Sequence, residues 1–426
     1  MIKSKNFLII AIGQLMSQLG NIIQRMALSL YVLDVTGSAK IFSMIIAISM
    51  IPEILLAPIG GAIADRFNKK KIMIGLDIIS GVILLAFILF VSNGNLSVIT
   101  IGGLVFVLQI IESVYDPTSR AAIVNVVKKE DLSKANSIIT GISAITMLIG
   151  PVAAGFLYGF CKIEVIFIIN LITFFISAII ECFLKMKYEK IRLEESPIKV
   201  FNKDIKESIK FLCNENKFLF AMVIIGTATN LFLMPIYSIG VPYIEKKIYG
   251  VTSAMYGISE GIVGVGMIVG ALLNSLISKK YPIQKINKYF NILLIAEIIM
   301  GIVVMPFMIN SNGISYLAYI IFTLSGFLFA ATITNLSIIC NTYIQTKTPS
   351  NMIGKITSLV TVLSLIFMTV GQGVFGILYE ALSSKLFLIY VIVGLCTISF
   401  GFITKRCTNK YYTNTSKNEE ITSLVG

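Results

Sequence analysis

The sequence predicts an all-α integral membrane protein whose twelve membrane-spanning helices form two bundles of six. The first observation is composition: 56% of the residues are hydrophobic and 13% are charged, which lies outside the range of soluble globular proteins. The second is a series of twelve apolar runs of the length needed to cross a hydrocarbon core about 30 Å thick. The third is a similarity between the two halves of the chain.

The apolar runs divide into two sets of six with a long polar segment between them. Their approximate cores are 8–33, 41–63, 72–91, 96–115, 138–160 and 163–184, then 218–243, 254–277, 289–309, 314–340, 353–382 and 386–402. We therefore predict a first bundle over 1–184, a cytoplasmic linker over 185–217, a second bundle over 218–404 and a cytoplasmic tail over 405–426. Within the linker, Asp204 to Phe211 has the charge and apolar spacing of an amphipathic helix at the inner surface.

The positions of the basic residues predict the orientation of the chain. With the first residue in the cytoplasm, 29 of the 35 lysines and arginines lie in segments on the cytoplasmic side. This distribution predicts that both termini are cytoplasmic, in a multi-pass protein of the cell membrane. The net charge of +13 then reflects basic loops facing an anionic leaflet, so we expect a lipid-bilayer partner and no nucleic acid.

The repeat is clearest in one helix of each half. Residues 137–158, SIITGISAITMLIGPVAAGFLY, and residues 358–379, SLVTVLSLIFMTVGQGVFGILY, are identical at nine of 22 positions without a gap. Because the identities include glycine, serine, threonine and tyrosine, apolar composition alone does not account for them. Duplicated six-helix units are typical of proteins in which two bundles rock around a site near the bilayer midplane.

Several function classes lack the residues that they require. The chain has no histidine, and its six cysteines are scattered, so we expect no catalytic triad, disulfide framework or ordinary metal site. A phosphate-binding G-x-x-x-x-G-K-[ST] loop is also missing from the sequence. We therefore predict a protein that is not an enzyme and has no cofactor.

The stretch GGAIADRFNKKK, residues 60–71, concentrates charge between two apolar runs. Glycine allows a close helix approach, an acid at a helix end pairs with a cation or a helix N-terminus, and lysines hold the loop in the cytoplasm. This pattern resembles the loop between helices 2 and 3 of the major facilitator superfamily of secondary transporters. The resemblance covers nearly the whole chain and implies a major facilitator fold with a conformational latch, formed here by Gly61, Asp65, Arg66, Lys69 and Lys70. The alternative is a simple topology signal.

Two further stretches resemble one branch of that family. YDPTSRAAIVNVVKKEDLSKANSI, residues 115–138, and NTYIQTKTPSNMIGKITSL, residues 341–359, are similar to loops of the macrolide-efflux and enterobactin-exporter branch. The pair Asp116-Pro117 also fits a helix end, since proline disfavours helix in the preceding residue. The run 141–155 resembles a glycine-proline motif of exporters, although Met147 replaces one usual glycine; its members here are Gly141, Gly150, Pro151 and Gly155. Ordinary small-residue packing is the alternative.

Ionisable residues inside apolar runs are expensive and therefore mark function. The acids in such positions are Glu53, Asp77, Glu112, Glu181, Glu260 and Glu297, and Arg25 is the lone cation. We select Glu53, near the middle of the second run, as the first candidate for proton coupling. Asp77 and Glu112 are further candidates, with a latch partner or an acid that snorkels to the surface as the alternative for each.

The first apolar run carries a polar stripe at helical spacing. Gln14, Gln18, Asn21 and Arg25 are separated by four, three and four residues, which places them on one helix face. We expect this face to line a central cavity for substrate, and Asn230 to be the corresponding feature of the second half.

Together these features predict a secondary active transporter that exports amphipathic small molecules, of the macrolide or multidrug efflux type, by proton antiport with alternating access. Export of an endogenous metabolite such as a siderophore is the alternative, and an uptake symporter or a transporter-like sensor is the second alternative. The expected partners are a small-molecule substrate and protons, and twelve helices are enough for a monomeric transporter.

Overall fold

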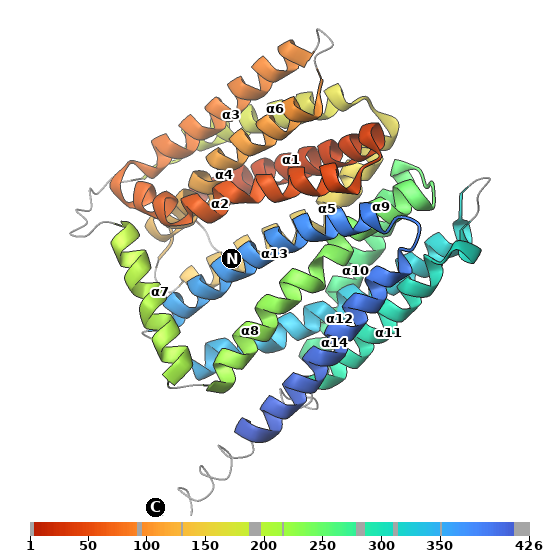
Figure 1. Cartoon of the computed structure of the whole chain (residues 1–426). Coiled ribbons are helices and arrows are strands. Elements are labelled where there is room, and N and C mark those ends of the chain that lie inside the picture. The colour runs from red at the N-terminus through yellow and green to blue at the C-terminus, as the bar shows by residue number, and fades with distance from the viewer. Residues whose placement is uncertain are drawn as a thin grey trace, which may run out of the picture. The chain divides into compact units, whose positions relative to one another are not determined.

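A computed structural model describes residues 4–91, 96–128, 131–186, 197–214, 217–277, 286–309, 314–349 and 352–412. The elements in these ranges are helices, which confirms the all-α prediction (Figure 1). Ten of the described helical segments are long and apolar enough to span a membrane, and α5 contains a shorter apolar stretch, Ile149–Phe160. Because α11 has only 17 residues, the count of twelve spans stays a prediction, as does the location of the termini.

The chain forms two compact units, Met1–Phe201 with Thr252–Gly261 (unit 1) and Asn202–Val251 with Ile262–Gly426 (unit 2). The helices of unit 1 are α1 (Lys5–Thr36), α2 (Ala39–Arg66), α3 (Lys69–Val91), α4 (Val98–Val126), α5 (Leu132–Phe160) and α6 (Ile163–Cys182). The boundaries predicted at 184 and 217 are not tested by this division and stay predictions.

The helices of unit 1 begin and end at residues with suitable capping chemistry. The hydroxyl of Ser4 accepts from the Phe7 amide at the start of α1, and Gly37 ends this helix with φ 62°, a conformation that favours glycine. At the start of α4, Ser97 and Thr100 form a reciprocal capping box. Each cap satisfies backbone groups that would otherwise lack a partner near the membrane surface.

The possible helix end at Asp116-Pro117 is not observed. Helix α4 continues through Pro117 to Val126, because the ring of proline removes one backbone hydrogen bond but does not prevent the helix from continuing. Likewise α5 continues through Pro151 to Phe160.

In unit 1, α1 packs against α5 and α6, α2 packs against α4, and α3 packs against α4 and α6. One apolar core gathers Leu28, Leu84, Leu104 and Phe167 from four of these helices. A second gathers Ile10, Met73 and Ala122. Polar side chains lie between these apolar layers and form the candidate site described below.

Unit 2 begins with most of α7 (Pro197–Asn214) and continues with a span that contains two π-helical segments. The other elements are α8 (Lys217–Phe232), η2 (Ile236–Gly240), α9 (Val241–Tyr243), η3 (Ile244–Ile248), most of α10 (Ser253–Ile277), α11 (Asn287–Val303), η5 (Pro306–Met308), α12 (Tyr316–Lys347), α13 (Ile353–Ala381), α14 (Phe387–Cys407) and η6 (Thr408–Tyr412). Pro235 and Pro242 lie in the interrupted span, where their missing amide hydrogens favour irregular turns. Helix α11 packs against α12 and α14, and α8 packs against α13.

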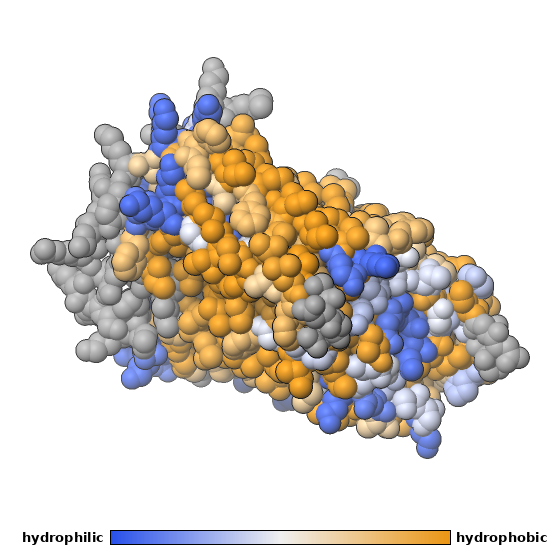
Figure 2. Space-filling model, turned by 90° about the horizontal axis from the view of Figure 1, so that it is seen from above, coloured by the Kyte–Doolittle hydropathy of each residue, from blue (hydrophilic) through white to orange (hydrophobic). Residues whose placement is uncertain are grey.

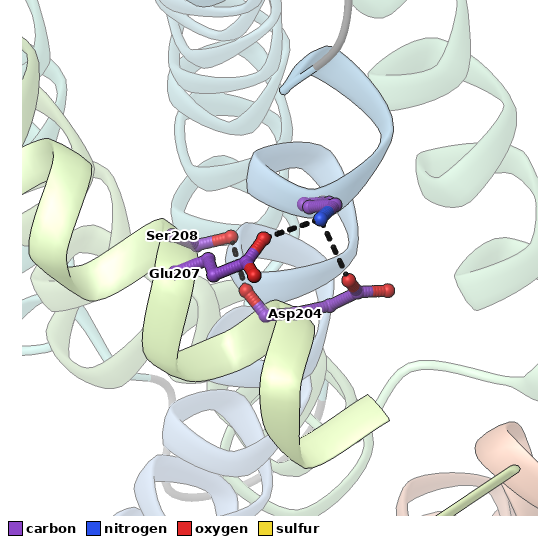
Figure 3. A network of polar contacts seen from close by, with 4 residues as sticks. Asp204, Glu207 and Ser208 are labelled. Atoms are coloured by element: carbon purple, nitrogen blue, oxygen red, sulfur yellow. Dashed lines mark hydrogen bonds and ion pairs between the residues drawn. The ribbon is translucent and has the colours of Figure 1, made fainter. Parts of the chain in front are cut away.

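Helix α7 includes the predicted segment Asp204 to Phe211 and packs its apolar face onto unit 2. Leu212 is buried with side chains of α8, α12 and α13. On the flank of this face, Lys355 of α13 binds Glu207 and lies 3.0 Å from an oxygen of Asp204 (Figure 3). The Lys355 ammonium hydrogen bond lowers the pKa of Glu207 below its usual value. Helix α7 is thus held by both apolar packing and charge.

The outer surface of the helices is hydrophobic over a broad area, with hydrophilic residues gathered in patches (Figure 2). Large apolar side chains are exposed on it, among them Leu89, Ile179, Leu272, Leu324 and Leu395. Such a surface is unfavourable in water and suits contact with lipid.

Candidate functional site

A polar seam joins α1 to α6 inside unit 1. Residues with small side chains on α1 allow the two helices to approach: a Cβ atom added to Gly20 would lie 2.1 Å from Oδ1 of Asn170. Asn170 in turn donates to Oε1 of Gln24 at 2.6 Å. On α6 the seam consists of Asn170, Thr173, Ser177 and Glu181, all buried. Their spacing of three, four and four residues is the same helical pattern that predicted a polar stripe on α1.

Two acids meet at one end of this seam. They are Asp77 on α3, which is 2% exposed, and Glu181 on α6, which is 0% exposed. Tyr115 of α4 donates its hydroxyl hydrogen to Oε1 of Glu181 at 2.6 Å, and Ser17 of α1 donates to Oδ1 of Asp77 at 3.4 Å. The hydroxyl of Ser177 interacts with Asp77 and lies close to Glu181. Side chains from α1, α3, α4 and α6 therefore converge on the two acids.

A second cluster contains both acids and cations. Glu53 of α2 and Glu112 of α4 are electrostatic neighbours, and Arg25 of α1 faces them. Nη1 of Arg25 donates to Oε1 of Gln109 at 3.3 Å. Asp116, one turn along α4, has Glu112, Arg120 and Arg25 among its neighbours. The structure thus brings the predicted residues Glu53, Glu112 and Arg25 together and places Asp77 in the other cluster.

Two small cavities connect these clusters. One, of about 10 Å³, is lined by Ser17, Asp77, Tyr115, Glu112 and Asp116 together with Gln18 and Asn21. The other, of about 20 Å³, is lined by Asn21, Gln24, Arg25, Gln109 and Glu112. Glu112 lines both. A polar cavity of about 10–15 Å³ has room for one water molecule, so polar groups continue from Arg25 to Asp77 with gaps of water size.

The polar stripe of α1 is mostly engaged with neighbouring helices of unit 1. Gln14 is 0% exposed and its Oε1 accepts from Ser119 of α4 at 3.3 Å. Oε1 of Gln18 accepts from Ser143 of α5 at 3.3 Å. Asn21 lines both small cavities. A role of these residues in substrate binding stays a prediction.

Unit 2 contains a larger cavity of about 160 Å³. Asn230 lines it and donates through Nδ2 to Oγ of Ser364 at 3.3 Å, and its role in binding substrate stays a prediction. Its lining is otherwise mostly apolar, with Met222, Phe290 and Leu336 among the side chains, and with Thr229, Ser337, Cys340, Asn341 and Thr404 as further polar members. None of the described lining residues is a lysine, arginine, aspartate or glutamate, so the polar side chains in this cavity are uncharged.

The duplicated helices make corresponding contacts in the two units. Ser143 of α5 and Ser364 of α13 are equivalent in the sequence repeat, and each bonds to a carboxamide on the first span of its own unit, Gln18 or Asn230. The equivalent glycines behave alike. A Cβ atom on Gly150 would lie 2.4 Å from Cγ2 of Ile22, and one on Gly371 would lie 2.4 Å from the carbonyl oxygen of Leu231. The repeat therefore preserves a packing arrangement as well as a sequence.

The remaining residues of the α5 motif have different environments. A Cβ atom on Gly155 would lie 2.5 Å from Cα of Gly257, in the part of α10 that belongs to unit 1. At this point two backbones are in close contact. For Gly141, no described atom lies within 4 Å of an added Cβ atom, and Pro151 lies inside the continuous helix.

Of the predicted latch, the surroundings of Gly61 and the side chains of Asp65 and Arg66 lie outside what the structure describes. Lys69 is buried, and Nζ of Lys70 donates to the carbonyl oxygen of Cys182 at 2.7 Å. Lys70 therefore binds the last turn of α6, where a cation is favoured by the helix dipole. The latch itself stays a prediction.

Comparison with known protein families identifies the family of this chain. The model of the Major Facilitator Superfamily matches residues 10–372. The chain belongs to the Major Facilitator Superfamily. This transporter is therefore a multi-pass protein of the cell membrane, and the resemblance drawn from the sequence is confirmed.

Relatives of the transporter include proteins named for macrolide and multi-drug efflux and one named for the transport of staphyloferrin A. It is 26% identical to macrolide efflux protein A of Streptococcus pyogenes over 62% of its own length and 64% of that protein's. It is 24% identical to the staphyloferrin A transporter of Staphylococcus aureus over 91% of its length and 94% of that protein's. The multi-drug resistance efflux pump PmrA of Streptococcus pneumoniae is 28% identical over 39% and 40% of the two chains. The chain thus spans less than two thirds of the length of these two efflux proteins.

Solved structures support the fold. A D-xylose-proton symporter superposes with a TM-score of 0.68 at 14% identity, over 93% of this chain and 96% of the other. A bacterial homologue of the lysosomal transporter Spinster superposes with a TM-score of 0.70 at 12% identity, over 96% and 98%.

Sequence reasoning did not select Glu181 or Tyr115 as site residues. Glu181 was recognised as an acid in an apolar run but could not be paired with Asp77, because α3 and α6 are about 100 residues apart in the chain. The polar spacing on α6 was an available signal. Tyr115 carried no such signal, since most tyrosines in a membrane protein serve packing.

Proposed function

We propose that the transporter exports amphipathic small molecules of the macrolide or multidrug type by proton antiport with alternating access. The observation that carries the proposal is the uncharged, mainly apolar cavity around Asn230 in unit 2. Such a cavity suits an apolar group with a few hydrogen-bonding atoms. At about 160 Å³ it is smaller than a drug-sized ligand, so it serves as a subsite for one part of the cargo.

The buried acids of unit 1 support proton coupling. Glu53 and Glu112 lie together near Arg25, and Asp77 and Glu112 line the same water-sized cavity. A buried acid that exchanges a proton changes the charge of a low-dielectric interior, and this change favours one packing of helices over another. The energy is sufficient: one proton crossing a potential of ~150 mV supplies roughly 3.5 kcal/mol, equivalent to a gradient of about 300-fold.

The proposal involves binding and movement only. The cargo leaves chemically unchanged, the coupling ion is the proton, the protein acts as a monomer without a cofactor, and nucleic acid is not a partner. The efflux names of two relatives support the direction of transport.

Export or import of a siderophore is a second candidate. It is favoured by the staphyloferrin A transporter, because the alignment with that relative covers 91% of this chain. An anionic siderophore requires cationic contacts, and Arg25, which faces Glu53 and Glu112, is the one cation of the predicted polar stripe.

The test is accumulation of a macrolide, a cationic dye and a catecholate siderophore in cells that lack their own pumps. The intact transporter should lower accumulation of the macrolide or the dye, and a protonophore or Glu53→Gln should abolish this effect. Glu164→Gln, an exposed acid in the first turn of α6, is the matched control and should behave as the intact protein. Lowered accumulation of the siderophore alone would select the second candidate, and raised accumulation would reject export.

A further inference from the structure

The end of the polar seam in unit 1 has an unbalanced charge. Oδ2 of Asp77 and Oε2 of Glu181 are buried and have no hydrogen-bond partner among the described atoms. Among the described residues, no lysine or arginine is an electrostatic neighbour of either carboxyl group. Two carboxylates without a cation are strongly unfavourable in a membrane interior. The arrangement therefore calls for a positively charged species that binds between them.

We propose that Asp77 and Glu181 form a single proton-binding site, which holds one shared proton in the resting transporter and releases it during transport. Release of the proton during transport rests on the proposed function, whereas binding of the proton by the two acids does not. Proton binding here differs from coupling at Glu53 or Glu112 in that the proton belongs to a pair of acids and that Tyr115 is part of the site.

The groups around the pair favour this occupancy. Tyr115 donates to Oε1 of Glu181 at 2.6 Å and Ser17 donates to Oδ1 of Asp77 at 3.4 Å, so each acid has one oxygen engaged by a hydroxyl group. Each has one oxygen left, and a hydrogen on one of these oxygens satisfies a group that is otherwise without a partner. Glu181 also lies in the last turn of α6, where the helix dipole disfavours a negative charge.

Charged groups beyond the pair do not replace the proton. Lys71 and Lys185, the cations nearest in sequence to Asp77 and Glu181, are exposed, and the Lys70 ammonium binds the carbonyl oxygen of Cys182. Lys69 lies beside Lys70, two turns before Asp77 on α3. On α4, the cavity of about 10 Å³ separates Asp77 from the further acids Glu112 and Asp116. These acids add negative charge on the side of the water-sized cavity.

The cavity provides a route for the proton. Asp77 and Glu112 both line it, and Glu112 also lines the cavity of about 20 Å³ beside Arg25. A water molecule in the first cavity takes the proton from the pair when it leaves. The site then changes from one negative charge to two at the junction of α1, α3, α4 and α6, which destabilises their close packing.

Infrared difference spectroscopy of the purified full-length transporter tests the site without any cargo. The carbonyl-stretch band of protonated carboxyl groups is followed as the pH is raised. We expect a band equivalent to one proton, which disappears in Asp77→Asn, in Glu181→Gln and in the double variant alike. Tyr115→Phe should keep the band and shift its frequency and its midpoint pH. Glu164→Gln should leave the band unchanged.

A second buried acid serves as an internal reference. Glu297 of α11 is 0% exposed and accepts from Thr397 of α14 at 2.9 Å. A band that disappears only in Glu297→Gln identifies that group and is subtracted. Size-exclusion profiles and thermal unfolding of each variant identify misfolded protein, and Tyr115→Phe, which changes one oxygen atom, remains informative if an acid variant does not fold.

Several outcomes would overturn the inference. If Asp77→Asn and Glu181→Gln each removed a separate band and the losses added up, the acids would titrate independently. If the folded protein gave no band that depends on either acid, the site would not be a proton site. A normal band with no effect of the transporter on drug accumulation would reject the proposed cargo and leave the proton site standing.

Discussion

The contact between α1 and α5 and the contact between α8 and α13 are related by the internal repeat, yet their surroundings differ in charge. Both contacts use a serine of the duplicated helix and a carboxamide of the first span, Gln18 with Ser143 and Asn230 with Ser364. Next to Gln18 lies the cavity that contains Asp77, Glu112 and Asp116. Next to Asn230 lies a larger cavity without such residues in its described lining.

The comparison indicates that the two units share a helix packing but differ in their buried groups, with the clusters of acids in unit 1 and the uncharged cavity in unit 2. The third and sixth spans illustrate this: α3 and α6 bring together two acids, whereas α11 and α14 bring together Glu297 and Thr397. A single acid with a hydroxyl partner satisfies itself more easily than a pair. We therefore expect coupling to depend on unit 1 and cargo contacts to include unit 2.

The largest expected effect comes from replacing an acid in each of these two pairs of helices by its neutral amide. Asp77→Asn should abolish proton-driven efflux, which removes a gradient of up to about 300-fold at ~150 mV. Glu297→Gln should keep most of it, because Glu297 has a hydroxyl partner and lies outside the acid clusters of unit 1. The measurement is cargo efflux from vesicles with an imposed pH gradient. Equal losses in the two variants would contradict the assignment of coupling to unit 1.

The next effect concerns the glycines of the repeat. Gly371→Ala should destabilise the protein by about 1–3 kcal/mol, because the new Cβ atom would lie 2.4 Å from a backbone oxygen of Leu231 and 2.9 Å from the ring of Pro235. Gly150→Ala should cost less, since its Cβ atom meets the movable side chain of Ile22. Thermal unfolding followed by circular dichroism measures the difference.

Gly373→Ala is the control for this pair, because no described atom lies within 4 Å of the added Cβ atom. Its unfolding temperature should stay near that of the intact protein. A larger loss for Gly150→Ala than for Gly371→Ala would show that α1 and α5 pack more rigidly than α8 and α13.

A smaller effect is expected at the cavity of unit 2. Asn230→Ala should weaken cargo binding by about 10-fold at most, since one neutral hydrogen bond contributes about 0.5–1.5 kcal/mol. The pH dependence of transport should not change, because the acid clusters lie in unit 1. Ser399→Ala is the control: this exposed residue bonds to the carbonyl oxygen of Leu395 in its own helix. A shifted pH profile for Asn230→Ala would contradict the proposed separation.

Much of the fold was predictable because membrane spans and internal repeats depend on the order of residues within short stretches of sequence. Apolar runs, basic loops and the 22-residue repeat predicted an all-α chain with related halves, since backbone groups in lipid require helices. The same reasoning selected Asp77 and Asn230. The sequence did not predict that α4 continues beyond Pro117 to Val126, because the effect of one proline on a helix depends on the neighbouring helices.

Which side chains contact one another across different helices could not be predicted from the sequence. Helical spacing shows which residues share a face but not which helix that face meets. The convergence of Asp77, Tyr115 and Glu181 depends on how α3, α4 and α6 cross, and their contacts join residues 66 positions apart in one case. Gln14 shows the same limit: its spacing placed it on the polar face of the first helix but did not show that this face meets Ser119 of α4.

The smallest effect concerns α7, the helix that precedes the spans of unit 2. Lys355 lowers the pKa of Glu207, so this acid stabilises the attachment of α7 above the unfolded value of about 4.3, and the contribution is lost as the pH falls through the lower folded value. Glu207→Gln should therefore lower the unfolding temperature slightly at neutral pH, and the difference should disappear in strong acid. Because the side chain of Glu207 is 40% exposed to solvent, salt should also reduce the difference. Lys206→Gln, an exposed change on the same helix, should show no such pH dependence; a difference that persisted in acid would mean that packing of the side chain, and not its charge, holds α7 in place.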